Sequence, residues 1–277
     1  MHVYPAFFEP INQDPEHEQL RHDALAIRRN GLASLEHVFN QMGCAGLDKL
    51  CLLPQDYSSF LGRGLVTNEE IRQLVDLAPE KFIGFACVDP LAPLAAEKLE
   101  YAFSHLGLAG LYLHPGRQRF RPSGEDLDPV YDLCEKHDLP IIFHAGFSWE
   151  PDTSTEFCHP LAFEALAACR PNLRICLSQF GWPWVRETAM IMLKYPQVYT
   201  NTGVLYFDSA IEFYIQTFTR DIPLSWIDRS LRHQVMFGSS NPRFEQIRMA
   251  EALGHLGLRD GTLKLIKGVN AAEFLGG

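Results

Sequence analysis

Short apolar runs alternate with longer amphipathic runs along almost the whole chain. The apolar runs have the length of buried strands, and the runs between them carry apolar residues at helical spacing. Seven such strands are predicted, over residues 47–54, 82–90, 108–115, 139–146, 173–181, 198–205 and 234–242. Continuously apolar strands that alternate with helices indicate a parallel sheet covered by helices on both faces.

A further short strand at residues 2–4 brings the number of predicted strands to eight. Eight strands that alternate with helices predict an α/β fold, the (β/α)8 TIM barrel, in which strand 1 is short or truncated. The chain has 277 residues, which suits one such barrel, so we expect a single domain over residues 1–277. The alternative is an open doubly wound sheet, but no GxGxxG motif follows an early strand.

Helices are predicted in the segments that separate the strands. Asn68 suits the N-cap position of an amphipathic run that ends before Pro79. Residues 206–232 form a long aromatic insertion, which we expect to be helical and to pack against either the barrel or a second subunit. The other expected helices cover residues 32–43, 91–107, 127–138, 160–171, 185–196 and 244–257, and a last one ends the chain.

Charge and composition exclude several classes of partner. There are 34 acidic and 24 basic residues, a net charge of −10, which argues against nucleic acid because phosphate backbones bind basic faces. No apolar run approaches the ~18–20 residues of a membrane span, and the first residues lack the pattern of a signal peptide. The seven cysteines contain no CxxC motif and are expected to be reduced, which predicts a cytoplasmic protein.

Polar side chains end most of the predicted strands. In a parallel barrel the functional site lies at the C-terminal ends of the strands, so these side chains should meet at one face. Their recurrence at successive strands is a stronger signal than any one of them alone. They are His2, Tyr4, His114, His144, Gln179, Asn201, Thr202, Ser239, Ser240 and Asn241.

Several of these strand ends stand in phrases that resemble a known family. The phrases are FIGFACVDP, YLHPGRQRFRP, LPIIFHAG, RPNLRICLSQFGWPW, YPQVYTNTG and FGSSNP. Their order and spacing, over roughly residues 34–276, resemble the amidohydrolase-related barrels (amidohydrolase family 2). That family includes aminocarboxymuconate-semialdehyde decarboxylase, the resorcylate decarboxylases and the pyrone-dicarboxylate lactonase. The resemblance implies a TIM barrel and a small-molecule substrate.

The resemblance also implies where a divalent metal would bind, and this chain departs from that pattern. The family's site takes an HxH pair at strand 1, a His at strand 5, a His at strand 6 and an Asp at strand 8. His144 matches the strand 5 ligand, and His2 most resembles the second His of the pair. Gln179 and Ser240 stand where the family has His and Asp. A catalytic zinc normally takes three strong protein ligands, so we predict no tightly bound metal and no other cofactor. A weakly held zinc at His2 and His144 stays open as an alternative.

The loop after the fourth strand carries arginines at alternate positions, Arg117, Arg119 and Arg121. In an extended loop this alternation would aim all three the same way, and guanidinium groups bind carboxylates in a forked geometry. The loop therefore predicts an anionic, carboxylate-bearing substrate, unless the arginines are simply solvated or paired with acidic neighbours. Four aromatic residues are predicted to wall a planar ligand, namely Phe147, Trp149, Trp182 and Trp184, although Trp182 and Trp184 could equally anchor the next helix in the core.

Three hypotheses about function remain open at this point. In the first, the chain is a hydrolase or a decarboxylase-like lyase that acts on a small carboxylated molecule, cyclic or open-chain, without a tightly bound metal. His144 would act as acid or base with Gln179, Ser240 and His114, and Asn241 would contact the substrate. In the second, the chain is a non-catalytic binding or scaffold protein on a decayed barrel. In the third, it is a zinc hydrolase with non-standard ligands such as His114. The family resemblance also suggests a homodimer.

Overall fold

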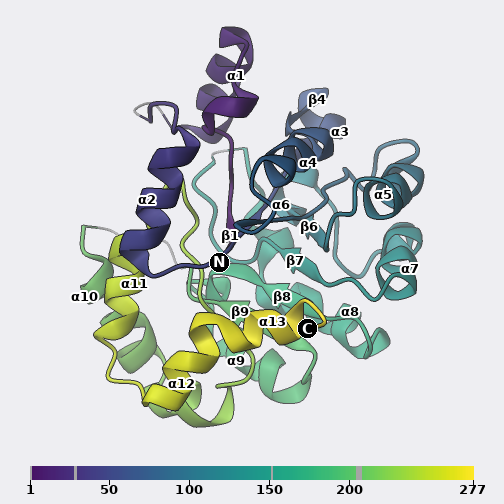
Figure 1. Cartoon of the computed structure of the whole chain (residues 1–277). Coiled ribbons are helices and arrows are strands. Elements are labelled where there is room, and N and C mark those ends of the chain that lie inside the picture. The colour runs from purple at the N-terminus through teal and green to yellow at the C-terminus, as the bar shows by residue number, and fades with distance from the viewer. Residues whose placement is uncertain (1, 28–29, 151, 204–207) are drawn as a thin grey trace.

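Eight short parallel strands form the centre of the molecule in the part of the chain that the structure describes. The structure is a computed structural model and describes residues 2–27, 30–150, 152–203 and 208–277. Helices surround the strands (Figure 1). The strands are β1 (His2–Val3), β2 (Leu50–Leu52), β5 (Phe82–Gly84), β6 (Leu111–Leu113), β7 (Ile141–Phe143), β8 (Ile175–Leu177), β9 (Val198–Asn201) and β10 (Val235–Met236).

Two parallel bridges join these strands into a closed ring. One sheet has the order β1-β2-β5 and the other β10-β9-β8-β7-β6. Ala86 pairs with Leu111 between β5 and β6, and Val3 pairs with Asn241 between β1 and the end of β10. The Tyr4 amide donates to the Asn241 carbonyl at 2.8 Å. The predicted TIM barrel is confirmed, and its first strand is short, as expected.

The continuous apolar runs are explained by burial on both faces of the ring. All three residues of β6, β7 and β8 are buried. The central residues Tyr112, Ile142 and Cys176 belong to the cluster inside the barrel, and their strand neighbours belong to the layer beneath the helices. An alternating pattern with one polar face would leave polar groups without water in one of these two layers.

Helices follow the strands approximately as predicted. They include α1 (Pro15–Leu25), α2 (Leu35–Ala45), α4 (Asn68–Leu77), α5 (Ala95–Ser104), α7 (Asp128–Lys136), α8 (Glu164–Cys169), α9 (Val185–Lys194), α11 (Gln246–Gly254), α12 (Asp260–Lys264) and α13 (Asn270–Phe274). The prediction that Asn68 caps α4 is wrong. Thr67 is the N-cap, because its hydroxyl and the Glu70 carboxylate form a reciprocal capping box.

The C-terminal helix α13 lies across one end of the barrel (Figure 1). Phe274 packs into the barrel interior, and its carbonyl accepts a hydrogen bond at 2.9 Å from Arg174, which precedes β8. Arg174 lies at the N-terminal end of its strand, so α13 covers that end. The opposite end, where the polar strand ends gather, carries the loops.

A two-stranded antiparallel hairpin, which the sequence does not predict, lies in the loop after β2. It consists of β3 (Gln55–Tyr57) and β4 (Arg63–Val66), joined by α3 (Ser58–Leu61). The Gln118 amide donates to the Asp56 carbonyl at 2.8 Å, and the buried Asp89 carboxylate accepts from the Ser59 amide at 2.8 Å. These bonds fix the hairpin against the barrel mouth.

The predicted insertion after β9 is helical from Ala210 onward. It contains α10 (Ala210–Ile215) and two wider helical turns, and residues 204–207 lie outside the described part. Tyr214 and Phe218 are fully buried, and Phe218 packs edge-on against Phe180 at 5.4 Å. These aromatic residues pack against the barrel. Within the described residues, no helix is both long and apolar enough to cross a membrane.

Candidate active site

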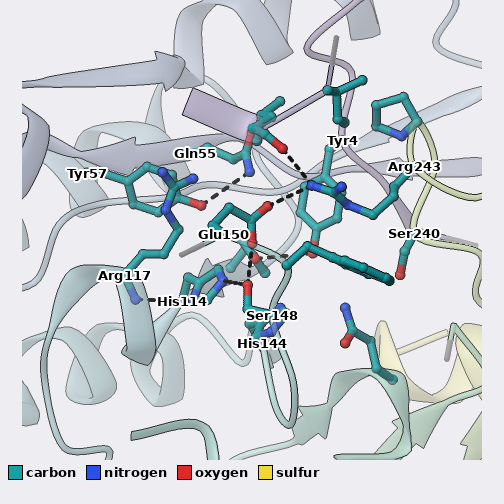
Figure 2. A pocket seen from close by; sticks show the side chains of 16 residues that line it. Tyr4, Gln55, Tyr57, His114, Arg117, His144, Ser148, Glu150, Ser240 and Arg243 are labelled. Atoms are coloured by element: carbon teal, nitrogen blue, oxygen red, sulfur yellow. Dashed lines mark hydrogen bonds and ion pairs between the residues drawn. The ribbon is translucent and has the colours of Figure 1, made fainter. Parts of the chain in front are cut away.

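A narrow cavity opens at the mouth of the barrel, where the C-terminal strand ends meet (Figure 2). Its volume is about 50 Å³. The wall combines charged, polar and aromatic side chains from six strand ends and from the segment after α1. They are Tyr4, Leu25, Ile27, Gln55, Tyr57, Tyr112, His114, Arg117, His144, Ser148, Trp149, Glu150, Gln179, Ser240, Pro242 and Arg243.

Two histidine rings stack on one side of this cavity. The rings of His114 and His144 are 3.9 Å apart and inclined by 8°. The His144 Nε2 lies 3.2 Å from the Phe147 carbonyl, which can only accept, so Nε2 carries the proton and Nδ1 keeps its lone pair. His114 has the same tautomer, because its Nδ1 accepts from the Arg117 amide at 3.4 Å and its Nε2 faces the Ser148 hydroxyl at 3.5 Å.

Burial keeps both rings neutral. Desolvation lowers the pKa of His144 to about 4, although the Glu150 carboxylate acts in the opposite direction. The pKa of His114 lies well below its usual value, first because the ring is buried and then because a positive charge there would be repelled by the Arg117 guanidinium and by a protonated His144. At neutral pH the His144 Nδ1 is therefore an unprotonated base, and no described residue hydrogen-bonds to it.

A buried carboxylate stands between the histidines and a cation. The Ser148 hydroxyl donates to Glu150 Oε2, and the Arg243 guanidinium lies 3.2 Å from Glu150 Oε1. Burial alone would raise the pKa of Glu150, but the bond from Ser148 and the charges of Arg243 and Arg117 hold it below its usual value. Arg243 also donates to the Leu25 carbonyl at 2.6 Å, which ties α1 to the same cluster.

Arg117 is a nearly fully buried cation in the wall of the cavity. Its side chain is 2% exposed, and its Cζ lies 4.4 Å above the Tyr57 ring. One terminal nitrogen reaches the Ala24 carbonyl at 3.0 Å and the Asp152 carboxylate at 3.4 Å. Its Nε and Nη1 have no hydrogen-bond partner among the described residues. Buried donors without partners are rare, so these two point to a ligand.

The predicted cluster of three arginines is wrong. Residues Pro115–Gln118 form a short helix, α6, and Arg119 ends it in the left-handed region at φ 57°. Because the segment is helical, the alternation expected of an extended loop does not apply. Arg119 lies over the Phe60 ring at 4.1 Å, and Arg121 is 70% exposed and pairs with Glu156 at 3.5 Å.

The predicted aromatic residues have different surroundings. Trp149 lines the cavity, whereas Phe147 packs edge-on against Trp149 and Trp182, with ring centres 5.4 and 6.0 Å away. Trp184 contacts the His159 ring at 4.5 Å. The Asn241 backbone carbonyl accepts from the Tyr4 amide and so closes the barrel, and the residue lines a neighbouring cavity.

The four positions at which the family resemblance implies metal ligands carry two histidines and two weak oxygen donors. The Nε2 of buried His2 and the Oε1 of Gln179 have no hydrogen-bond partner among the described residues. The Ser240 hydroxyl donates to the Gly203 carbonyl at 3.0 Å. Desolvation, with the nearby amino terminus and His144, lowers the pKa of His2 to about 3. With His144, these residues supply two imidazoles, an amide and a hydroxyl, and no carboxylate.

Seven of the predicted residues line one cavity, together with several that the sequence does not predict. The strand-end argument supplies Tyr4, His114, His144, Gln179 and Ser240, and the arginine loop and the aromatic residues supply Arg117 and Trp149. Ser148, Glu150 and Arg243 stand in loops just beyond His144 and Ser240, so reading further into those loops would have found them. Gln55 and Tyr57 belong to the unpredicted hairpin and carried no such signal.

Comparison with solved structures finds the same fold in distant proteins. An uncharacterized TIM-barrel protein from Bordetella bronchiseptica is 21% identical with a TM-score of 0.74, covering 88% of this chain and 83% of that one. The 5-carboxyvanillate decarboxylase from Sphingomonas paucimobilis is 16% identical with a TM-score of 0.69, covering 99% and 98%. A dihydroxybenzoic acid decarboxylase from Polaromonas, solved with bound manganese and the inhibitor 2-nitroresorcinol, is 16% identical with a TM-score of 0.66, covering 99% and 95%.

A search with the sequence finds no match among curated proteins. The family model described as Amidohydrolase matches residues 56–277, most of the chain. That match includes every barrel strand from β5 onward and the site residues His114, His144, Gln179 and Ser240. The chain belongs to the amidohydrolase family of TIM-barrel enzymes.

Proposed function

We propose that this protein is a lyase that removes carbon dioxide from a small, hydroxylated ring carboxylate. The observation that carries the proposal is the pairing of two groups in one cavity. Arg117 offers buried N–H donors without partners, and His144 offers a neutral nitrogen. A carboxylate and a transferable proton are the two features that these groups would recognise. The decarboxylases with this fold support the same substrate class.

In the proposed reaction the protein's own groups bind the substrate and move one proton. Arg117 holds the carboxylate, and the His144 Nδ1 accepts the proton of a ring hydroxyl. The protonated His144 then delivers that proton to the ring carbon that bears the carboxylate, and the carbon–carbon bond breaks as carbon dioxide leaves. Gln179 and Ser240 would hydrogen-bond substrate oxygens, and His114 would hold the His144 ring in place by stacking.

We also infer that the reaction needs no tightly bound metal. Zinc sites take three strong ligands, and manganese prefers carboxylate and carbonyl oxygens with water. The donors of His2, His144, Gln179 and Ser240 do not match either set. Elemental analysis of the purified protein checks this inference. One zinc or manganese per chain that survives chelation would contradict it.

Variants of Arg117 and His144 test the proposal. The purified protein is assayed for carbon dioxide release from 2,6-dihydroxybenzoate and 5-carboxyvanillate. We expect His144→Asn to lower kcat by about 100-fold or more, the usual contribution of a general acid or base. We expect Arg117→Met to raise KM, while Arg121→Met, which changes an exposed arginine, leaves both constants unchanged. A ligand that raises the Tm without any turnover would instead support a binding protein.

A further inference from the structure

Glu150 stands in the middle of the candidate active site (Figure 2). It is the carboxylate that lines the cavity on the loop after β7, and its side chain is only 13% exposed. One oxygen faces Arg243 at 3.2 Å, and the other accepts from Ser148. Arg117 contributes a second positive charge from the opposite wall. A carboxylate of the protein thus already occupies the binding site beside Arg243, within the field of the Arg117 charge.

The cavity that remains is too small for a ring carboxylate. Its volume is about 50 Å³, whereas an engineered protein cavity that binds benzene measures ~150 Å³. A side chain must therefore leave before a substrate of the proposed class can enter. The strand ends and α6 are fixed by backbone pairing, but Glu150 and Trp149 stand on a loop that side-chain contacts hold at this point.

We propose that the Glu150 carboxylate occupies the anion subsite in place of a ligand, and that the substrate's carboxylate displaces it from Arg243. This inference rests on the proposed function for the identity of the natural anion. The exchange replaces one carboxylate with another, so the partly buried Arg243 guanidinium never loses its counter-charge. Leaving a buried charge without a partner is strongly unfavourable, so a neutral ring compound cannot carry out the same exchange.

The displacement has a consequence for affinity and for selectivity. The substrate can bind only to molecules in which Glu150 has left Arg243. Its apparent affinity is therefore lower than its intrinsic affinity by the fraction of molecules in that open form. Removing the Glu150 carboxylate should therefore tighten the binding of small carboxylates. It should also strengthen the preference for carboxylates over neutral rings of the same shape, because only an anion can restore the counter-charge that the substitution removes.

Small anions test the proposal independently of turnover. We compare the wild type with Glu150→Ala and Glu150→Gln, and use Glu156→Ala as a matched control, since Glu156 is exposed and pairs with the peripheral Arg121. The probes are acetate and 2,6-dihydroxybenzoate, and the readouts are Tm and the Kd from calorimetry. We expect Glu150→Ala to tighten both Kd values about tenfold, an effect of one order in K. Glu150→Gln should give a smaller gain, and Glu156→Ala none.

A second substitution locates the bound anion. In the Glu150→Ala background, Arg243→Met should abolish the gained acetate binding, because the anion subsite then lacks the guanidinium group that paired with Glu150. Resorcinol, the neutral ring, should gain little in the same series. Unchanged Kd values in Glu150→Ala, weaker binding in that variant, or acetate binding that survives Arg243→Met would each overturn the proposal.

The outcomes separate this inference from the proposed function. If Glu150→Ala gains acetate binding but neither the wild type nor this variant releases carbon dioxide, Glu150 does occupy the anion subsite and the proposed reaction is wrong. If the wild type decarboxylates its substrate and Glu150→Ala loses turnover with an unchanged or weaker Kd, the proposed reaction is supported. Glu150 then takes part in the reaction and does not block the anion subsite.

Discussion

The His144 ring decides how the proposed reaction depends on pH. Burial lowers its pKa to about 4, so the ring remains an unprotonated base well below the usual histidine range. We expect kcat/KM to stay nearly constant from pH 8 down to about pH 5 and to fall only as the pH approaches 4. A pH–rate profile checks this, with circular dichroism confirming the folded state at each point. An acid limb near pH 6.5 would show that another group, or a solvated histidine, limits the reaction.

Glu150 modifies the same profile in a predictable direction. Its negative charge stabilises the protonated form of His144 and so raises the pKa of that ring. In Glu150→Gln this stabilisation is lost, and the acid limb of kcat/KM should move to lower pH. A shift to higher pH would contradict this effect of the Glu150 charge on His144.

At the scale of single elements, the start of α4 shows how a cap contributes to stability. Thr67 and Glu70 satisfy each other's backbone amides in a capping box. We expect Thr67→Ala to lower the free energy of unfolding by about 1 kcal/mol, while Thr67→Ser retains most of it because the hydroxyl remains. Urea denaturation of both variants checks this. An equal loss in both would show that the Thr67 methyl group, not its hydroxyl, stabilises this end.

The element scale also explains which parts of the site escaped prediction. The strands are recognisable because burial on two faces demands a continuous apolar run. The β3–β4 hairpin has only three or four residues a strand, and hydrogen bonds to Asp89 and Gln118, which follow two other strands, hold it in place. Contacts between segments far apart in the chain leave no local pattern.

At the scale of the whole molecule, the buried histidines make the barrel sensitive to acid. The folded protein keeps His144 neutral down to about pH 4 and His2 down to about pH 3, whereas unfolded histidines protonate near 6.5. Above pH 6.5 the two histidines are neutral in both states, and the free energy of unfolding is at its full value. As the pH falls toward 4 and 3, only the unfolded chain can protonate them, so the free energy of unfolding decreases. At about 1.4 kcal/mol for each pKa unit, His144 alone accounts for about 3 kcal/mol.

Chemical denaturation between pH 7.5 and 4.5 measures this loss. The free energy of unfolding should fall steadily below pH 6.5, and His144→Asn should show a shallower slope because one buried imidazole is gone. His255→Asn, which changes a histidine on the surface, serves as the control and should keep the wild-type slope. A wild-type stability that does not change over this range would contradict the buried neutral state of these rings.

The order of residues along the chain is enough to specify the barrel and the side chains that its strands deliver to the mouth. Strand periodicity is a local property, and the closed ring follows from the number and order of the strands. For the same reason the sequence alone predicts that His114, His144, Gln179 and Ser240 lie together. Which charges meet is settled instead by tertiary packing. The turn of α6 separates Arg117 from Arg119 and Arg121, and the packing of three loops brings Glu150 onto Arg243. Loop conformation depends on contacts between distant segments, which no stretch of sequence encodes alone.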